Sequence, residues 1–475
     1  MNTNRRDFLK GTLWMGAAAI AAGARAADGV CCAGGKKPGC MATFAAPVLR
    51  KVRVGCVGLG ARGSSAVHRI SQIPGVEVAA ICDIRPDAVA RQKSWLAKHS
   101  KPAAKEFVGA EAWKALCQWD GIDVVYNTTP WDLHAPIGLE AMRCGKHVLI
   151  EVPAAMYLDE CWALVETSEK TGRHCMQLEN CCYGEIEMLA FNICHLGLLG
   201  ELKHGEGAYI HDLRAYNLKG YYNDWRLRWN IPHKGNQYPT HGLGPICQYM
   251  DINRGDRFDY LVSLECQPAG IADLARETIK DPNDWRRKAN IQMGDMNTTL
   301  IKTAKGRSIM VQHDVASPRP YNRLNLISGT KGMLCDYPYR LAVESRPGAG
   351  AHGFNDQLAA EWREKYKHPL WKRAGEIAKK VGGHGGMDFL MDLRWAFCLQ
   401  NGLPLDMNVY DLASWCSLCE LSEKSVRSRS GSVDVPDFTR GAWKTTPPLG
   451  LVDVDVSKMG LDAGAVKKDA SALNV

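Results

Sequence analysis

Hydrophobic and polar positions follow two different patterns along the chain. Between residues 51 and 180, short runs rich in Val and Ile alternate with longer stretches that have helical spacing. The runs predict strands at Val52–Val57, Val76–Cys82, Ile122–Tyr126, His147–Val152 and His174–Leu178. The intervening stretches predict helices at Ser64–Gln72, Pro86–Lys98, Ala135–Cys144 and Asp159–Thr171. Because such alternation needs crossover connections, it predicts a parallel, doubly wound sheet.

The pattern changes after residue 184, where a helix is predicted at Gly184–Gly200. Longer extended stretches then follow at Leu202–Arg214, Tyr260–Gln267, Thr298–Thr303, Ser308–His313 and Asn325–Ser328. Further helices are predicted at Asn355–Lys365, Asp388–Gln400 and Asp406–Ser422. The expected fold class is therefore α/β, with an N-terminal Rossmann sheet and a C-terminal α+β domain that has a largely antiparallel open sheet.

Composition is that of a globular protein, since 46% of the 475 residues are hydrophobic and 23% are charged. We expect a signal over residues 1–26, a linker over 27–50, a dinucleotide-binding domain over 51–180 and a substrate domain over 181–475. The net charge of +8 is modest, and the basic residues are scattered among acidic ones. We therefore expect no nucleic-acid partner.

The N-terminus has the composition of an export signal. The segment from Asn4 to Lys10, which contains Arg5 and Arg6, precedes an uncharged stretch and a small-residue site ending at Ala26. This sequence resembles a twin-arginine signal, which carries folded proteins across a membrane. The expectation is export to the periplasm, with no membrane association once the signal is removed. An ordinary secretory signal or a retained anchor remains an alternative.

The 18 cysteines are many for an exported chain, but most stand singly in apolar segments. There a cysteine behaves as a small core residue, which argues against a disulfide framework. Only Cys416 and Cys419 have the spacing of a metal or redox pair. Because no second such pair accompanies them, we expect no metal site.

A Gly-x-Gly-x-x-Gly motif lies between the first predicted strand and helix. Gly58 permits a tight turn, Gly60 lets the backbone approach a pyrophosphate, and Gly63 allows close packing of helix and strand. The next strand ends in Asp83, whose carboxylate can accept hydrogen bonds from ribose hydroxyls. These features predict a dinucleotide site that prefers NAD to NADP, although the nearby Arg85 leaves NADP open.

Two further segments follow strand ends at the edge where open α/β sheets bind ligands. In the first, Asn127–His134, the side chains of Trp131 and His134 could form a wall of the cofactor site, although Thr and Asp there also suit a capped helix start. The second is Glu151-Val152-Pro153.

These motifs resemble the family of glucose-fructose oxidoreductases and inositol dehydrogenases. That family usually has Glu-Lys-Pro, whose lysine assists oxidation of a sugar hydroxyl, whereas this chain has Val152. An ordinary sugar dehydrogenase would have lost a catalytic donor there.

One branch, glycoside hydrolase family 109, resembles the chain more closely. Its NAD-dependent α-N-acetylgalactosaminidases share the segments Glu179–Gly184, Gly205–Asp212, Trp225-Arg226, Gly235–Gly242, Gly385–Asp388 and Gly402–Asp406.

The resemblance implies a role for each matching residue. NAD would be bound by Ala61, Arg62, Asp83, Trp131, Asp132, Leu133, His134, Glu151, Val152 and Asn180, together with the glycines of the motif. The sugar would be bound by Tyr209, Arg226, Tyr238, Pro239, Thr240, His241 and Tyr321. The implied partner is a glycan or glycoconjugate, and family members often pair as homodimers through the antiparallel sheet.

Tyr238 and His241 are the candidate catalytic residues, because one helical turn would bring both side chains to the same face. Such a pair can exchange protons with a sugar near neutral pH. The expected mechanism oxidises sugar C3, removes the acidified C2 proton, eliminates the C1 substituent, adds water and returns the hydride. Which of the two residues is the base stays open.

Three of these features also have a purely structural explanation. His241 beside Pro and Gly could be structural, and Arg226 could stack on Trp225 at the surface. The glycine-rich stretch 382–386 around His384 is interpreted as a flexible turn before a helix rather than a ligand loop. The alternative functions are a net sugar oxidoreductase and a sugar-binding module without turnover.

Overall fold

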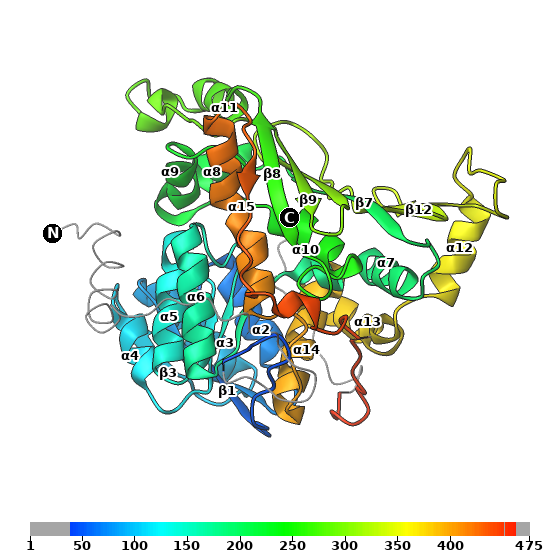
Figure 1. Cartoon of the computed structure of the whole chain (residues 1–475). Coiled ribbons are helices and arrows are strands. Elements are labelled where there is room, and N and C mark those ends of the chain that lie inside the picture. Colours follow the sequence, from blue (N-terminus) through cyan, green and yellow to red (C-terminus); the bar gives the residue numbers. More distant parts are fainter. Residues whose placement is uncertain (1–38, 451, 462–475) are drawn as a thin grey trace, which may run out of the picture.

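A computed structural model describes residues 39–450 and 452–461, which are built around two sheets (Figure 1). The predicted signal lies outside the described residues. The described part of the predicted linker packs on the C-terminal region: the backbone N–H of Met41 donates to Tyr410 Oη at 3.2 Å, and Ala45 forms a β-bridge with Pro404. Our division into domains at residues 51–180 and 181–475 stays a prediction.

The first sheet has six parallel strands in the order β3-β2-β1-β4-β5-β6. They are β1 (Val52–Val57), β2 (Val76–Asp83), β3 (Lys105–Val108), β4 (Val124–Asn127), β5 (His147–Ile150) and β6 (Cys175–Gln177). The strands at the centre are buried on both faces, which explains their continuous hydrophobic runs. The strand order reverses between β1 and β4, and this is where such sheets bind ligands.

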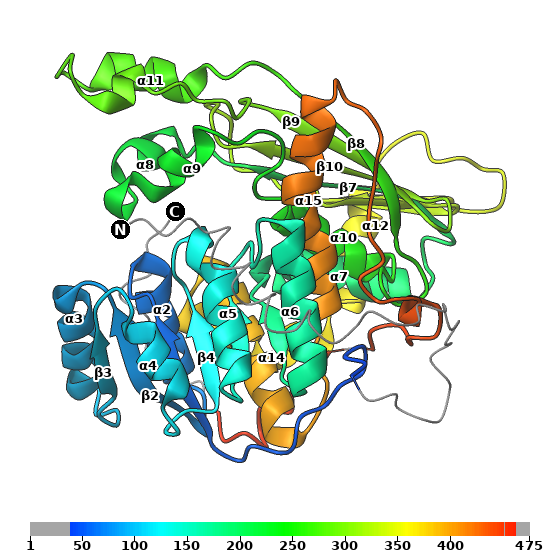
Figure 2. The ribbon, with the colours of Figure 1, turned by 60° about the vertical axis from the view of Figure 1, so that its left-hand side comes forward.

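Helices cover both faces of this sheet. They are α2 (Ala61–Ile70), α3 (Pro86–Lys98), α4 (Ala112–Gln118), α5 (His134–Arg143) and α6 (Leu158–Thr171). Figure 2 shows α4, α5 and α6 together on one face. Two helices from the end of the chain join them: α14 (Met387–Asn401) packs on α2 and β1, and α15 (Val409–Arg427) packs on α6. The C-terminal segment therefore completes the cover of the first sheet.

The second sheet has eight strands in the order β13-β12-β11-β7-β10-β9-β8-β14. They are β7 (Leu202–Ile210), β8 (Phe258–Glu265), β9 (Asn297–Thr303), β10 (Ser308–Asp314), β11 (Leu326–Gly329), β12 (Gly332–Cys335), β13 (Arg340–Val343) and β14 (Val433–Asp434). All described pairings are antiparallel except that of β7 with β10. The expected α/β class with a largely antiparallel second sheet is confirmed.

One face of the second sheet packs on helices, chiefly α10 (Thr240–Tyr249) and α15. The remaining helices are α7 (Glu185–His195), α8 (Arg214–Lys219), α9 (Trp225–Asn230), α11 (Gly270–Thr278), α12 (Asp356–Lys365) and α13 (Pro369–Val381). On the opposite face Tyr260, Leu264 and Leu300 are exposed. Among the described residues, no helix is long and apolar enough to cross a bilayer.

The predicted extended stretch Leu202–Arg214 was too long. Strand β7 ends at Ile210, and α8 begins at Arg214. The carboxylate of Asp212 accepts hydrogen bonds from the backbone N–H and the guanidinium of Arg214, which turns the chain between the two elements. The sequence pattern did not predict β3, β12, β13, β14 or the helices α4, α8, α9, α10, α11 and α13.

Two buried histidines make the fold sensitive to acid. His147 and His174 are each 4% exposed with their rings 5.2 Å apart, and burial lowers the pKa of His147 to about 4 and that of His174 to about 3. An unfolded histidine takes up a proton near pH 6.5, so the folded state stays neutral while the unfolded state is protonated. The free energy of unfolding is therefore not reduced by these histidines above about pH 6.5. It decreases as the pH falls below that value, by up to about 1.4 kcal/mol per pH unit for each histidine.

Urea unfolding at several pH values measures this loss. His174→Gln is expected to reduce the slope of the unfolding free energy between pH 6.5 and 4.5, whereas the exposed His352→Gln should leave it unchanged. A flat profile for the unmodified protein would contradict this account.

Candidate active site

The glycine-rich turn between β1 and α2 has the shape that a dinucleotide needs. Gly58 has φ +86°, and a Cβ on it would meet the backbone of Thr128 at 2.8 Å. A Cβ on Gly63 would lie 1.8 Å from the carbonyl oxygen of Gly58, so only glycine lets α2 pack this closely. A Cβ on Gly60 would meet no atom within 4 Å, so space is open where a pyrophosphate would lie. The residues present therefore fit NAD.

Asp83 lies at the end of β2 beside this turn. One carboxylate oxygen accepts from the backbone N–H of Leu59 at 2.6 Å, and the other accepts from the backbone N–H of Arg85 at 2.8 Å. Arg85 also pairs with the Asp83 carboxylate at 3.2 Å. The carboxylate is thus fixed where an adenosine ribose would lie, and Arg85 is already paired with it.

Arg62 joins the start of α2 to the C-terminal segment. Its guanidinium contacts Glu151 at 2.7 Å and Asp388 at 2.9 Å. Asp388 also contacts His384 Nδ1 at 3.0 Å and accepts from Asn180 Nδ2 at 2.5 Å. Burial alone would raise the pKa of Asp388, but the charges of Arg62, His384 and Arg69 hold it well below its usual range.

This cluster changes the interpretation of residues 382–386. The stretch does precede helix α14, as expected, and His384 contacts Arg62 Nη1 at 3.2 Å. It therefore lies beside a residue to which the resemblance assigns NAD binding, so it is more than a turn. The sequence signal was the Gly-rich loop itself, in which His384 is followed four residues later by Asp388.

The loop after β4 forms another wall. Trp131, Asp132 and Leu133 form the short 3₁₀ helix η2 (Trp131–Leu133), and Trp131 Nε1 donates to the carbonyl of Val152 at 3.3 Å. The two ring nitrogens of His134 lie 2.7 Å from the carbonyl oxygens of Pro153 and Thr129. His134 thus holds two cofactor-side loops together, while the 3% exposed Trp131 faces the aromatic residues described below.

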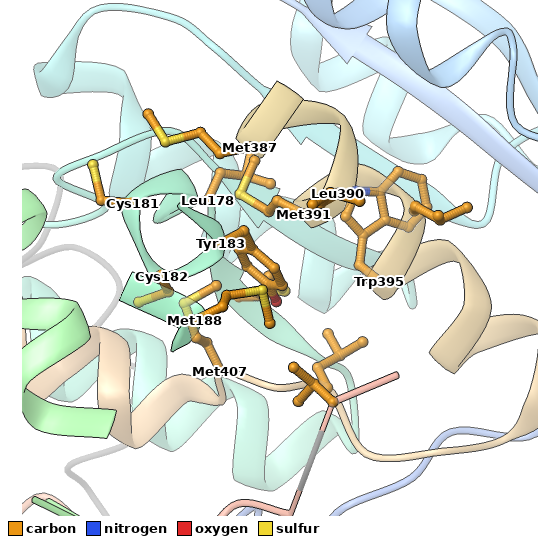
Figure 3. Close-up of a cluster of buried hydrophobic side chains, with 14 of the residues drawn as sticks. Leu178, Cys181, Cys182, Tyr183, Met188, Met387, Leu390, Met391, Trp395 and Met407 are labelled. Carbon is orange, nitrogen blue, oxygen red and sulfur yellow. The ribbon is translucent and has the colours of Figure 1, made fainter. Parts of the chain in front are cut away.

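Glu179 and Asn180 follow β6 at the start of the 3₁₀ helix η3 (Asn180–Tyr183). Figure 3 shows the side chains that fix this helix: Cys182 and Tyr183 lie among Met188, Met387, Met391 and Met407. The cluster is fully buried, and Tyr183 Oη donates to Asp406 at 2.8 Å. Packing on α14 therefore sets the positions of both polar residues.

Tyr238 and His241 are brought together as the sequence predicted, but not on one helix. Tyr238 precedes α10, which begins at Thr240, and its hydroxyl lies 3.4 Å from His241 Nε2. His241 Nδ1 lies 2.7 Å from Glu179 Oε1. Sequence reasoning missed this role of Glu179, because 62 residues separate the two partners.

The other predicted sugar-binding residues surround this pair. Tyr209 packs on Tyr238 with ring centroids 4.6 Å apart. The ring of Tyr321 is edge-on to that of Tyr209, with their centroids 6.3 Å apart. Thr240 is fully buried at the start of α10 after Pro239, so it supports the loop. His211, which the prediction omitted, lies 3.1 Å from Tyr209 Oη. Burial, with Arg226 and His241 nearby, lowers the pKa of His211 to about 4.

Arg226 is buried rather than stacked at the surface. Its guanidinium lies 4.8 Å from the Trp131 ring and 5.0 Å from the Tyr238 ring, and Nη1 donates to Tyr221 Oη at 3.0 Å. Within the described part of the chain its Nε and Nη2 have no hydrogen-bond partner, although Arg226 is only 6% exposed. Buried donors are nearly always satisfied, so two free ones indicate a place for a polar ligand.

One cluster has ligand atoms spaced for a metal. Atoms of Glu179, Cys181 and His241 lie within 4.8 Å of one another. Glu179 and His241 already share a hydrogen bond, and burial raises the pKa of the Cys181 thiol well above its usual range. The hydrogen bond with Glu179 suits a proton-transfer role for this histidine. Cys416 and Cys419 are buried, unbridged and in α15.

The glycines allow a direct test of the cofactor site. Gly60→Ala should lower NAD affinity roughly tenfold to a hundredfold without lowering the melting temperature, because its methyl group enters only the space that NAD needs. Gly63→Ala should lower both. Gly353→Ala, which also meets no atom within 4 Å, is the matched control and should change neither. Calorimetry of NAD binding and thermal unfolding measure the two effects, and unchanged affinity in Gly60→Ala would contradict the assignment.

The parallel sheet, its glycine turn and Asp83 define an NAD-binding Rossmann protein with a cluster of aromatic and polar side chains beside the cofactor site. Residues 52–178 match the oxidoreductase family with an NAD-binding Rossmann fold, and residues 183–445 match the glycosyl hydrolase 109 C-terminal domain. The chain belongs to glycosyl hydrolase family 109. It is a glycosidase that uses NAD.

Individual relatives agree with this assignment. A family 109 protein of Shewanella pealeana is 44% identical over 95% of this chain and 100% of its own length. An alpha-N-acetylgalactosaminidase of Shewanella oneidensis is 46% identical over 86% of this chain and 89% of its own. A levoglucosan dehydrogenase in complex with NADH and L-sorbose has the same fold, with a TM-score of 0.63 and 19% identity over 82% of this chain and all of its own.

Proposed function

We propose that the protein hydrolyses terminal α-linked N-acetylgalactosamine by transient oxidation at C3, with no net redox change. The observation that carries the proposal is the buried cluster in which Tyr238 contacts His241 and both Tyr238 and Arg226 pack on Trp131 of the cofactor loop. The name of the Shewanella oneidensis relative supports the choice of sugar.

NAD held at this site would accept a hydride from sugar C3 while the C3 hydroxyl gives up its proton to solvent, and the resulting ketone would make the C2 hydrogen acidic. The chain's own residues then have distinct tasks. Arg226 presents two unpartnered N–H donors to the sugar, suited to a hydroxyl or acetamide oxygen. Tyr238 and His241 take and return the C2 proton.

Val152 distinguishes this site from those of the related dehydrogenases. It stands where the related dehydrogenases have lysine, and it is 4% exposed with its carbonyl bonded to Trp131 Nε1. This position therefore supplies no proton donor or acceptor through its side chain. The ketone is consumed within the active site rather than released as a product.

The experiment is release of p-nitrophenol from its α-N-acetylgalactosaminide by the purified protein, with bound NAD measured after denaturation. Release with NAD retained and no net NADH supports the proposal. No release from any N-acetylhexosaminide, together with NADH formed from free sugars, would replace it with a dehydrogenase.

The proposal also includes export of the protein. We propose that the N-terminal arginine pair directs folded, NAD-loaded protein to the periplasm, and that it acts there on glycans or glycoconjugates without a nucleic-acid or membrane partner.

A homodimer through the second sheet is the proposed assembly. Leu264 is 67% exposed and Leu300 49% exposed on the face away from α10 and α15. Leu264→Lys together with Leu300→Lys is expected to shift the protein from dimer to monomer in light scattering, because two charges would be buried unpaired at the interface. A matched change at the exposed Leu196 should leave the mass unchanged. A monomeric unmodified protein would rule the assembly out.

A further inference from the structure

A short segment between α8 and α9 contacts residues on two sides of the cofactor site. It consists of Tyr221 and the 3₁₀ helix η4 (Tyr222–Asp224), and we call residues 221–224 the strap. In both overall views α8 and α9 lie above the first sheet (Figure 1 and Figure 2). Asn223 and Asp224 have φ of 54° and 50°, a left-handed conformation that Asn and Asp adopt more readily than most residues. The chain therefore turns sharply between the strap and α9.

The first contact of the strap is with the end of β2, where an adenosine ribose would lie. Cζ of Arg85 lies 5.0 Å from the centroid of the Tyr222 ring. Nε of the same arginine lies 3.2 Å from Oδ1 of Asp83, the carboxylate that suits the ribose hydroxyls. The Arg85 guanidinium is thus held between a carboxylate and an aromatic face, which attracts a cation. This contact joins the strap to the ribose side of the cofactor site.

The second contact of the strap is with the sugar side of the site. Nη1 of Arg226 donates to Tyr221 Oη at 3.0 Å, and Cζ of Arg226 lies 4.8 Å from the ring of Trp131 in the cofactor loop. The backbone of Tyr221 is extended, with φ −102° and ψ 135°, so its side chain and that of Tyr222 point to different sides. The strap therefore contacts both sides of the cofactor site through two consecutive tyrosines.

The remaining contacts of the strap are weak. Tyr222 is 50% exposed, and every residue of η4 is at least partly exposed. Asp224 Oδ1 lies 3.9 Å from Arg286 Nη1, and Arg228 Nε donates to the carbonyl oxygen of Asn223 at 3.0 Å. Exposed ion pairs and exposed cation–π contacts each stabilise a structure only slightly. The strap can therefore open without unfolding the domains that it joins.

We propose that Tyr222 and Arg85 form a latch that retains NAD, which leaves the protein only after the contact between these two side chains opens. The inference goes beyond the hydrolytic function, because it concerns release of the cofactor and not the sugar chemistry. A cofactor that is restored in each turnover does not need to exchange, so slow release is compatible with that function. Arg85, which the sequence left open as a contact for NADP, instead has a role in closing the site.

Exchange of bound NAD tests the latch without any sugar. The holoenzyme is loaded with NAD radiolabelled in the adenine ring and mixed with excess unlabelled NAD, and the label that stays bound is followed over time. Tyr222→Ala is expected to release the label about threefold to tenfold faster than the unmodified protein, because it removes the ring that Arg85 contacts. Tyr222→Phe keeps the ring and should release the label at the unmodified rate.

A similar pair elsewhere in the fold supplies a matched control. Phe354 is 44% exposed, and its ring centroid lies 5.1 Å from Cζ of Arg340. Phe354→Ala therefore removes an exposed aromatic ring from an arginine, as Tyr222→Ala does, and it should leave NAD release unchanged. Equally fast release in Phe354→Ala and Tyr222→Ala would overturn the latch, since the effect would then not depend on the place of the ring.

A double substitution tests whether Tyr222 acts through Arg85. Arg85→Ala keeps the backbone N–H that donates to Asp83 at 2.8 Å, but it removes the cation. Arg85→Ala combined with Tyr222→Ala should release NAD no faster than Arg85→Ala alone, because the latch is already lost. Unchanged release in Tyr222→Ala, or independent effects of the two substitutions, would overturn the inference. An unmodified protein that holds no NAD would overturn the latch together with the cofactor site.

Discussion

Tyr238→Phe is expected to lower kcat by about a hundredfold to ten-thousandfold while bound NAD remains at the level of the unmodified protein. The substitution removes only the hydroxyl that lies 3.4 Å from His241 Nε2. The ring contacts with Tyr209 at 4.6 Å and Arg226 at 5.0 Å are retained, so the packing of the cluster is unchanged. Steady-state kinetics with the p-nitrophenyl substrate give kcat and KM, and denaturation gives the NAD content.

Tyr157→Phe is the control for this substitution, because its hydroxyl makes the same 3.4 Å contact with His233. It should leave kcat within the range of the unmodified protein. If Tyr238→Phe retained full activity, the hydroxyl would have no part in proton transfer. If Tyr157→Phe lost as much activity as Tyr238→Phe, the loss would reflect packing of the aromatic cluster.

Asp388→Ala is expected to lower the free energy of unfolding by about 3 kcal/mol or more, as the loss of one partner from a buried ion pair usually does. Asp388 is 1% exposed, and it contacts Arg62, His384 and the fully buried Arg69. Without it, Asn180 Nδ2 loses its acceptor, and Arg69 keeps Asp392 as its charged partner and Ser65 Oγ as an acceptor. Urea unfolding measures the loss, and NAD content should fall with it because Arg62 and Asn180 lose their common anchor.

The pH dependence of this contribution has a definite sign. The folded pKa of Asp388 lies well below its usual value, so the stabilisation is present above about pH 4 and disappears as the pH falls below it. Asp434→Asn, at an exposed position on β14, is the control and should change neither stability nor NAD content. A stable, NAD-loaded Asp388→Ala protein would show that the cluster does not hold the cofactor site together.

Most of the first sheet could be predicted from the sequence, because parallel strands buried on both faces leave continuous Val and Ile runs. Helix Pro86–Lys98 agrees residue for residue with α3. The prediction failed where elements are short and rich in aromatic and charged residues. Helices α8 and α9 have six residues each, and no apolar periodicity can show in so short a span.

The candidate site was predictable only where its residues are set by local sequence. Gly58, Gly63 and Asp83 follow from local backbone requirements, and Tyr238 and His241 are close in sequence. Glu179 and Asp388 act through partners 62 and 326 residues away, which no local pattern reveals. The burial of Arg226 was equally hidden, because it depends on Trp131 and Tyr238 folding around it.

The fate of the C2 hydrogen tests the central claim most directly. The protein is incubated with an α-N-acetylgalactosaminide in deuterium oxide, and the released sugar is analysed by mass spectrometry and NMR while nicotinamide absorbance is followed. The account predicts one deuterium at C2 of the released sugar and no net NADH. Released sugar that keeps its C2 hydrogen would contradict it, since hydrolysis would then proceed without oxidation at C3.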